Sequence, residues 1–324
     1  MRKTGKMWLV ISLVFAMVIG AVGCGSQQPA AADKADAKKE IVIGLSFPAA
    51  DHGWLGAIIK NAEDEAKAQG VKYIITTADN PNKQTSDIED LITKKVSAIV
   101  MLPIESASMT PVAKKIKAAN IPLIVVDREI ESDDFTAVVK GDNKGIGING
   151  AKFIADKLKG KGNVVIISAP PSSVNTLRTG GFEETIKAFP DIKVLAMQDG
   201  GFQKEKGYTV MQNMLQAHKQ IDAVFTLDDE MALGAIKAIK EAKRTDIKLL
   251  TGAGGNKEYY EMIKNEKDIE MTTFIYSPLM VKDGVKLAVN ILKGNTPKEK
   301  VTVIPANAIT RENVDKYYDA KANY

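Results

Sequence analysis

Cysteine is almost absent from this chain of 324 residues, because Cys24 is the only one. A disulfide-stabilised scaffold is therefore excluded. Histidine is nearly as scarce, with only His52 and His218, so a metal site built on two histidines has no support. Walker A, GxSxG, HExxH and CxxC motifs are also missing. We expect no metal, no cofactor and no catalytic residue.

An excess of one charge sign is missing as well. The chain has 44 Lys and Arg against 40 Asp and Glu, a net charge of +4. Arg2, Lys3 and Lys6 lie in the first 23 residues, which hold no acid, so the remainder carries +1. This balance offers no electrostatic surface for nucleic acid. With 45% hydrophobic and 26% charged residues, the composition is globular and excludes a disordered, collagen-like or coiled-coil chain.

The apolar run from Met7 to Val22 is sixteen residues long and follows the basic residues. A membrane-spanning helix needs roughly 20 apolar residues, so residues 1–23 are interpreted as a secretory signal peptide. The run ends in Ala21-Val22-Gly23-Cys24, which resembles a lipobox, where the cysteine receives a lipid before cleavage. An ordinary signal with an incidental cysteine is the alternative. We favour lipidation of Cys24 because the only cysteine falls at this position.

Residues 24–39 are low in complexity and hold no large apolar side chain, so they cannot form a core. We interpret them as a flexible tether. It would hold a folded domain at the outer face of the cytoplasmic membrane, or in the periplasm.

From residue 41 onward, short apolar runs alternate with amphipathic stretches. Strands are predicted at 41–47, 73–77, 98–102, 122–126, 137–139, 164–168, 194–197, 223–227, 248–252, 271–276 and 301–304. Helices are predicted at 54–69, 106–119, 145–159, 203–218, 230–242 and 278–293, with others around Ile88 and before Phe189. This alternation is typical of parallel sheets covered on both faces. About 280 residues exceed the usual domain of ~100–200, so we predict two Rossmann-like α/β lobes.

Open parallel sheets bind ligands at the carboxyl ends of their strands. Polar and aromatic residues gather at these ends, and our candidate ligand contacts are His52, Trp54, Asp127, Arg128, Arg178, Phe202, Asp228, Asn256 and Tyr276. Carboxylates accept hydrogen bonds from hydroxyls, guanidinium groups donate them, and aromatic faces stack on the CH face of a ring. The charges balance, which favours a neutral monosaccharide or polyol over a sugar phosphate or acid.

Several stretches carry a resemblance to a known family: VVDRE at 125–129, GDNKGIGINGA at 141–151, RTGGF at 178–182, GYTVMQNMLQAH at 207–218 and AVFTLDDEMALGAIKAI at 223–239. In order and spacing the chain resembles the ribose-type periplasmic sugar-binding proteins of bacterial ABC importers. The resemblance implies a type I periplasmic-binding (Venus-flytrap) fold with three crossing segments. We expect an N-terminal lobe at 40–140 plus 277–305 and a C-terminal lobe at 141–276 plus 306–324. The implied function is monosaccharide or polyol capture by a monomer for an ABC permease and its ATPase.

The resemblance also implies roles for single residues. Asp127 and Arg128 match the pair that grips sugar hydroxyls, Arg178 matches a donor of the second lobe, and Phe202 matches a stacking aromatic. His52, Trp54, Asp228 and Tyr276 stand where the family has Asn, Phe, Asn and Gln. A family loop with a carboxylate is here Gly252-Ala253-Gly254-Gly255, which lacks it at Gly254. These departures argue against ribose itself.

Other interpretations remain open. His52 beside Asp51 also fits a catalytic base, and Trp54 also fits a core residue at a helix start. The GxGxxG match at Gly145, Gly147 and Gly150 is interpreted as helix packing, because no acidic residue follows at the next strand end. The alternative functions are a ligand sensor for a membrane receptor and an exported carbohydrate-active enzyme.

Overall fold

The computed structural model describes residues 40–322 and 324, and Glu40–Tyr324 forms one compact unit. The predicted signal peptide, the lipidation of Cys24 and the tether lie outside the described residues. Within the described part, every helix is too short or too polar to cross a membrane.

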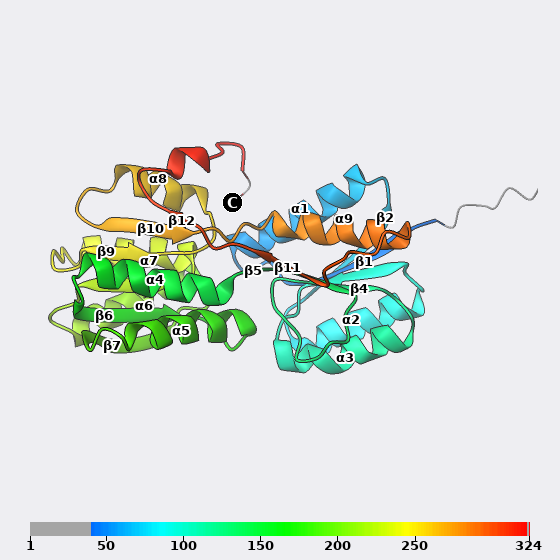
Figure 1. Ribbon diagram of the computed structural model, residues 1–324, viewed down its shortest axis with the longest axis horizontal. Helices are drawn as coiled ribbons and strands as arrows, with labels where there is room; N and C mark the ends of the chain where they lie inside the picture. Colours follow the sequence, from blue (N-terminus) through cyan, green and yellow to red (C-terminus); the bar gives the residue numbers. More distant parts are fainter. Residues whose placement is uncertain (1–39, 323) are drawn as a thin grey trace, which may run out of the picture. The chain divides into compact units, whose positions relative to one another are not determined.

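The first sheet has six parallel strands in the order β11-β5-β4-β3-β1-β2 (Figure 1). Its strands are β1 (Val42–Pro48), β2 (Lys72–Ala78), β3 (Ala98–Met101), β4 (Leu123–Val126), β5 (Ala137–Gly141) and β11 (Val301–Ile304). Four helices cover it, namely α1 (Gly53–Ala68), α2 (Pro81–Thr93), α3 (Ser106–Ala118) and α9 (Met280–Leu292). The helices α1 and α9 pack together on one face, and α2 and α3 on the other. We call this sheet with its helices the first lobe.

The second sheet has the strand order β12-β10-β9-β8-β6-β7. Its neighbouring strands are parallel, except that β12 pairs with β10 in the antiparallel direction. Its strands are β6 (Lys161–Ser168), β7 (Asp191–Asp199), β8 (Ala223–Thr226), β9 (Leu249–Thr251), β10 (Glu270–Phe274) and β12 (Ala308–Ile309). Its helices are α4 (Asn143–Lys157), α5 (Ser173–Ile186), α6 (Lys204–Ala217), α7 (Asp229–Glu241), α8 (Lys257–Asn265) and the 3-10 turn η1 (Val314–Lys316). We call this sheet with its helices the second lobe.

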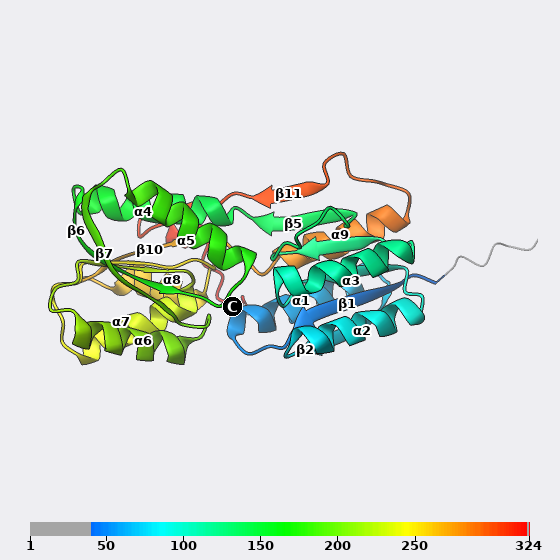
Figure 2. The ribbon, with the colours of Figure 1, turned by 90° about the horizontal axis from the view of Figure 1, so that it is seen from below.

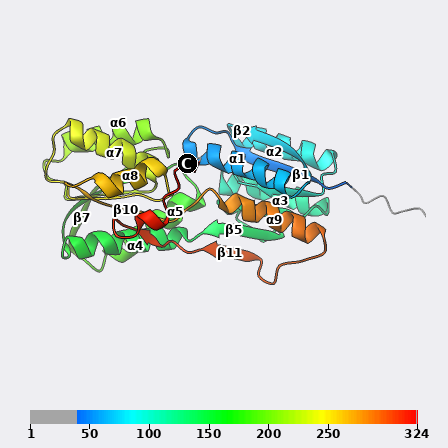
Figure 3. The same ribbon diagram turned by 90° about the horizontal axis from the view of Figure 1, so that it is seen from above.

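The helices of the second lobe lie on both faces of its sheet. Figure 2 and Figure 3 show α4 and α5 on one side and α6 and α7 on the other. The central strand β8 is fully buried between them. This burial on both faces explains why AVFT reads as an unbroken apolar run rather than an alternating one.

The chain passes between the two sheets three times, from β5 to α4, from β10 to α9 and from β11 to β12. The prediction of two α/β lobes with parallel sheets is confirmed. The exact residues at which the lobes begin and end stay a prediction. All predicted strands and helices are present, but α8, β12 and η1 were not predicted. The nine residues of α8 bury only Tyr259, Tyr260 and Ile263, so its apolar face is short.

Candidate ligand-binding site

A cavity with about 360 Å³ of empty space, part of it open to solvent, is lined by residues of both lobes. Its lining consists of His52, Trp54, Asp127, Arg128, Val174, Arg178, Phe202, Asp228, Ala253, Tyr276 and Tyr324. Most of these residues follow the carboxyl ends of parallel strands, where open sheets place their ligands. The structure thus brings together eight of the nine predicted residues, and Asn256 is the exception.

Asp127 lies at the end of β4 and is 4% exposed. Its carboxylate accepts a hydrogen bond from the Tyr276 hydroxyl, and Tyr276 also accepts one from Asn143 Nδ2 at 3.1 Å. Burial raises the pKa of Asp127, while the charge of Arg128 and the Tyr276 bond act in the opposite direction. Asp127 therefore offers an oxygen to the cavity from a position fixed by both lobes.

Arg178 of α5 is 2% exposed and is held on three sides. Its Nε donates to Asn143 Oδ1 at 2.9 Å, and Nη1 donates to the Leu227 carbonyl. Its guanidinium lies 4.2 Å from the centre of the Tyr276 ring, a cation–π distance. Arg178 thus uses several of its donors to hold its own position in the site. Its side chain also lines the cavity.

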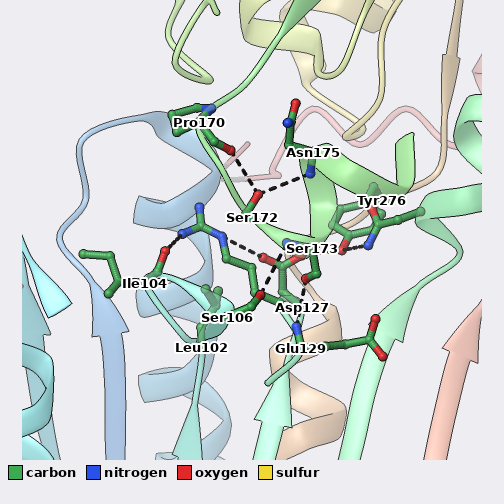
Figure 4. A network of polar contacts seen from close by, with 12 residues as sticks. Leu102, Ile104, Ser106, Asp127, Glu129, Pro170, Ser172, Ser173, Asn175 and Tyr276 are labelled. Carbon is green, nitrogen blue, oxygen red and sulfur yellow. Dashed lines mark hydrogen bonds and ion pairs between the residues drawn. The ribbon is translucent and has the colours of Figure 1, made fainter. Parts of the chain in front are cut away.

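Arg128 has a different environment. Its Nη1 donates to the Ile104 carbonyl at 2.6 Å, in the network of Figure 4. Its Nε lies 3.9 Å from Asp127 Oδ2, beyond hydrogen-bond distance, and this buried nitrogen has no partner among the described residues. A buried donor without a partner is costly unless something else accepts its hydrogen bond.

Aromatic rings form much of the remaining wall. The rings of His52 and Phe202, from different lobes, are 6.0 Å apart and nearly parallel at 22°. Trp54 lies 5.8 Å from Tyr276, and its Nε1 donates to the Tyr276 carbonyl at 2.9 Å. Such rings present flat apolar faces on which a sugar ring stacks.

Two site residues have a left-handed backbone, Asp127 with φ 68° and Phe202 with φ 57°. Asp tolerates this conformation, but it is uncommon for a bulky aromatic. Strain of this kind clusters at functional sites, where the surrounding structure enforces it. At Phe202 the preceding Gly201 is also left-handed, with φ 67°.

Asp228 and Asp229 are buried next to each other at the start of α7. Asp228 Oδ1 accepts from the Met231 amide at 2.8 Å and so caps the helix. Burial raises the pKa of Asp228 to about 7 and that of Asp229 to about 6. Asp229 accepts from Thr273 Oγ1 and from the amides of Gly255 and Asn256, so it holds the β9–α8 loop.

Asn256 supports the loop beside the cavity and does not contact the cavity itself. Its side chain caps α8 by accepting from the Tyr259 amide at 3.2 Å, and it does not line the cavity. His52 is paired with Asp51 through Nδ1 at 2.6 Å. The other histidine, His218, directly follows α6 in the second lobe. Among residues 40–322 and 324, no group of three or more His, Cys, Asp or Glu side chains is arranged to hold a metal.

The two lobes are joined by hydrogen bonds beside the cavity. The Glu129 amide donates to Ser173 Oγ at 3.0 Å, and the Ser173 amide donates to Ser106 Oγ at 3.3 Å (Figure 4). On another side, the Trp54 amide donates to Glu230 Oε1 at 3.1 Å. The contacts link α5 and α7 of the second lobe to the first lobe, so the cavity is closed by both.

Val174, Ala253 and Tyr324 line the cavity but were not predicted as ligand contacts. Val174 and Ala253 are apolar, and nothing in their type signals a site. Tyr324 follows no predicted strand, so the rule that led to the other residues does not reach it. Asn143 is also missing from the prediction, although its position after β5 fits the same rule.

The family model described as "Periplasmic binding protein domain" matches residues 43–296, well over half of the chain. The chain belongs to this family. The type I periplasmic-binding architecture and the resemblance to ribose-type sugar-binding proteins are thereby confirmed.

Individual relatives are similar over most of their length. The ribose import binding protein of Bacillus subtilis (strain 168) is 35% identical over 305 residues, 93% of this chain and 97% of its own. The xylitol-binding protein of Mycolicibacterium smegmatis is 32% identical, over 77% of this chain and 72% of its own. The structure of the arabinose ABC transporter's binding component from Shewanella sp. ANA-3, bound to L-arabinofuranose, superposes with a TM-score of 0.79. It is 27% identical, over 85% of this chain and 93% of its own.

Proposed function

We propose that the protein is an extracytoplasmic substrate-binding protein of an ABC importer. It binds a neutral monosaccharide or polyol between its lobes and delivers it to the permease, which an ATPase drives. The observation that carries this proposal is the cavity itself, where two aspartates, two arginines and several aromatic rings from both lobes converge. The relatives described above bind ribose, xylitol and arabinofuranose, which agree with this ligand class.

The electrostatics of the cavity favour a ligand without charge. Asp127 is flanked by the positive charges of Arg128 and Arg178. Asp228 lines the same cavity, so two carboxyl groups stand against two guanidinium groups. A phosphate or carboxylate ligand would meet Asp127 and Asp228, whereas hydroxyls can both donate to the aspartates and accept from the arginines.

The proposed ligand contacts are His52, Trp54, Asp127, Arg128, Arg178, Phe202, Asp228 and Tyr276. Since they belong to both lobes, a ligand that touches them has more contacts when the lobes are together than when they are apart. Only such differential affinity shifts the equilibrium toward the closed form. In that form a monomer presents both lobes to the permease. The proposal includes attachment to the membrane through a lipid on Cys24.

A melting-temperature screen of pentoses, hexoses and polyols, with sugar phosphates and sugar acids beside them, tests the ligand class. We expect at least one neutral compound to stabilise the protein, because a ligand that binds only the folded state raises its stability. Stabilisation by phosphorylated or acidic sugars alone would contradict the proposal, as would no stabilisation by any compound.

Calorimetry with variants then localises binding. Arg128→Ala removes a buried donor that has no partner among the described residues, and we expect affinity to fall about 10- to 150-fold. The control is Arg244→Ala, because Arg244 pairs with Asp246 away from the cavity. Equal affinities for both variants would show that the ligand binds elsewhere.

A further inference from the structure

Tyr324 is packed between Gly53 of the first lobe and Gly254 of the second, in the lining of the cavity. It is 9% exposed and belongs to the cavity lining. A Cβ added to Gly53 of the first lobe would lie 3.5 Å from Tyr324 Cδ2. A Cβ added to Gly254 of the second lobe would lie 3.4 Å from Cε1. The ring thus occupies space that glycine leaves free on both sides.

The hydroxyl of Tyr324 is buried and makes no hydrogen bond within the part of the chain that the structure describes. Burial raises the pKa of Tyr324, and a nearby Asn256 side chain opposes this only slightly, without the geometry of a hydrogen bond to the hydroxyl. Its Oδ1 already accepts from the Tyr259 amide. Buried polar atoms without partners are rare, so each calls for an explanation.

Arg128 also has a buried donor without a hydrogen-bond partner. Among the described residues, the buried side-chain polar atoms without a partner are Arg128 Nε, Thr251 Oγ1 and Tyr324 Oη. Two of these three belong to residues that line the cavity. Both can donate a hydrogen bond, so each is a candidate donor to an acceptor atom of a ligand in the cavity.

The position of the hydroxyl also bears on Gly254. A side chain at this position would begin 3.0 Å from Tyr324 Oη, so the hydroxyl fills space that a larger residue would need. The resemblance places a carboxylate at this position of the loop, and this sequence has none there. Tyr324 therefore supplies a polar group where the loop lacks one. Burial raises its pKa well above the ordinary value, so the hydroxyl keeps its proton.

We propose that Tyr324 is a specificity-determining ligand contact, whose hydroxyl donates a hydrogen bond to an oxygen of the bound monosaccharide or polyol. The proposal rests on the proposed function, because it assigns a further contact to the same cavity. A carboxylate can only accept a hydrogen bond from a sugar hydroxyl, whereas a phenol can donate one. Tyr324 thus selects a ligand that presents an acceptor, such as a ring oxygen or a hydroxyl oxygen, beside it.

The test uses the full chain and the variant Tyr324→Phe, which removes only the hydroxyl. Tyr318→Phe is the matched control, since the Tyr318 hydroxyl bonds to Glu261 at the exposed surface. D-ribose, xylitol and L-arabinose are titrated first by calorimetry, and the tightest of them is compared with its deoxy analogues. We expect Tyr324→Phe to weaken binding about 5- to 50-fold, and the control to bind like the wild type.

The deoxy analogues give a readout that is independent of folding. If Tyr324 contacts one ligand oxygen, loss of that oxygen weakens binding to the wild type but has little further effect on Tyr324→Phe. This holds even if the variant melts at a lower temperature. Equal affinity of wild type and variant for the tightest ligand, or equal sensitivity to every deoxy analogue, overturns the proposal alone. Failure of the wild type to bind any neutral sugar or polyol overturns both this proposal and the proposed function.

Discussion

Trp54 belongs both to the cavity wall and to the core of the first lobe. It is 8% exposed and packs in the cluster that includes Ile58 of α1 and Val285 of α9. Its ring also lines the cavity and lies beside Tyr276. The two interpretations that the sequence left open are thus combined in one residue, because a large indole ring is long enough to touch both regions.

This position makes Trp54 an internal reporter of binding. The other tryptophan, Trp8, lies in the predicted signal peptide, and removal of that peptide would leave Trp54 as the only tryptophan. We expect its emission to change saturably when ligand excludes water from the cavity, with the same affinity as calorimetry. Trp54→Phe should abolish the signal and weaken binding. An emission spectrum that a confirmed ligand leaves unchanged would remove Trp54 from the contacts.

The titration of Asp228 predicts how stability depends on pH. Burial raises its pKa to about 7 and that of Asp229 to about 6, against about 4 in an unfolded chain. Between about pH 4 and 7 the folded protein retains protons that the unfolded chain has released. The free energy of unfolding therefore falls as the pH rises through this window, and we expect a higher melting temperature at about pH 5 than at about pH 8.

The variant Asp228→Asn isolates this contribution. Asparagine also caps helices, so the bond to the Met231 amide is retained while the titrating proton is lost. The decrease in melting temperature with pH should become shallower but not vanish, because burial also raises the pKa of Asp229, Asp127 and Glu230. The exposed Asp191→Asn serves as control. An identical pH dependence in all three proteins would contradict the assignment.

At the level of whole elements, α1 depends on the other lobe for its N-terminal cap. His52 precedes the helix, but its side chain makes no capping hydrogen bond. Glu230 of α7 instead accepts from the Trp54 amide, and it lies against Gly53. A negative charge at a helix N-terminus is favourable because of the helix dipole and the free amides there. The bond exists only while the lobes are together.

Glu230→Ala should therefore shift the equilibrium toward open lobes. We expect ligand affinity to fall about 2- to 30-fold, with little change in the melting temperature of the ligand-free protein. Glu241→Ala on the same helix is the control, since Glu241 pairs with Tyr208 at the surface. Calorimetry and thermal melts of both variants decide the matter. Unchanged affinity in Glu230→Ala would mean that this contact does not contribute to closure.

The helices α4 and α5 explain the glycine-rich match. A Cβ at Gly147 would collide with the backbone at Arg178, and one at Gly181 would lie 2.5 Å from the Lys144 carbonyl. Gly147 and Gly181 therefore let the two helices approach closely, which supports helix packing for Gly147, whereas Gly150 lies against Phe225 of β8. Because Arg178 lies on α5, this approach also fixes the position of a proposed ligand contact.

At the scale of the whole molecule, ligand binding should change the distance between the lobes. A ligand that contacts both lobes adds its own contacts to the hydrogen bonds that join them, so it favours the closed form. Small-angle scattering should show a smaller radius of gyration at saturation with ligand than without it. The Arg128→Ala variant should need a higher ligand concentration for the same change. Identical scattering with and without ligand would argue against closure.

The proposed attachment to the membrane is also tested at this scale. We expect the processed chain to begin at Cys24 and to fractionate with membranes. Cys24→Ser should release soluble protein or leave the precursor uncleaved, because the lipid is joined through the thiol. Mass spectrometry of the N-terminus and membrane fractionation provide the readout. A Cys24→Ser protein that is cleaved and still membrane-bound would contradict lipidation.

The sequence by itself determined the alternation of strands and helices, the two lobes and most of the cavity lining. Periodicity is a local property, and in parallel sheets the carboxyl ends of neighbouring strands meet at one edge. Asp127, Arg128 and Asp228 could be chosen for this reason without knowing any contact. The motifs at 125–129 and 223–239 then connected these positions to a family.

Only the tertiary structure decided which side chains line the cavity and which ones cap helices or hold loops. Asn256 follows a strand like the others, yet its amide caps α8 and stays outside the cavity. Tyr324 does not directly follow a strand, yet it belongs to the cavity lining. Glu230 caps a helix of the other lobe across 176 residues of sequence. Contacts between distant segments depend on packing and not on local pattern, so no reading of periodicity could supply them.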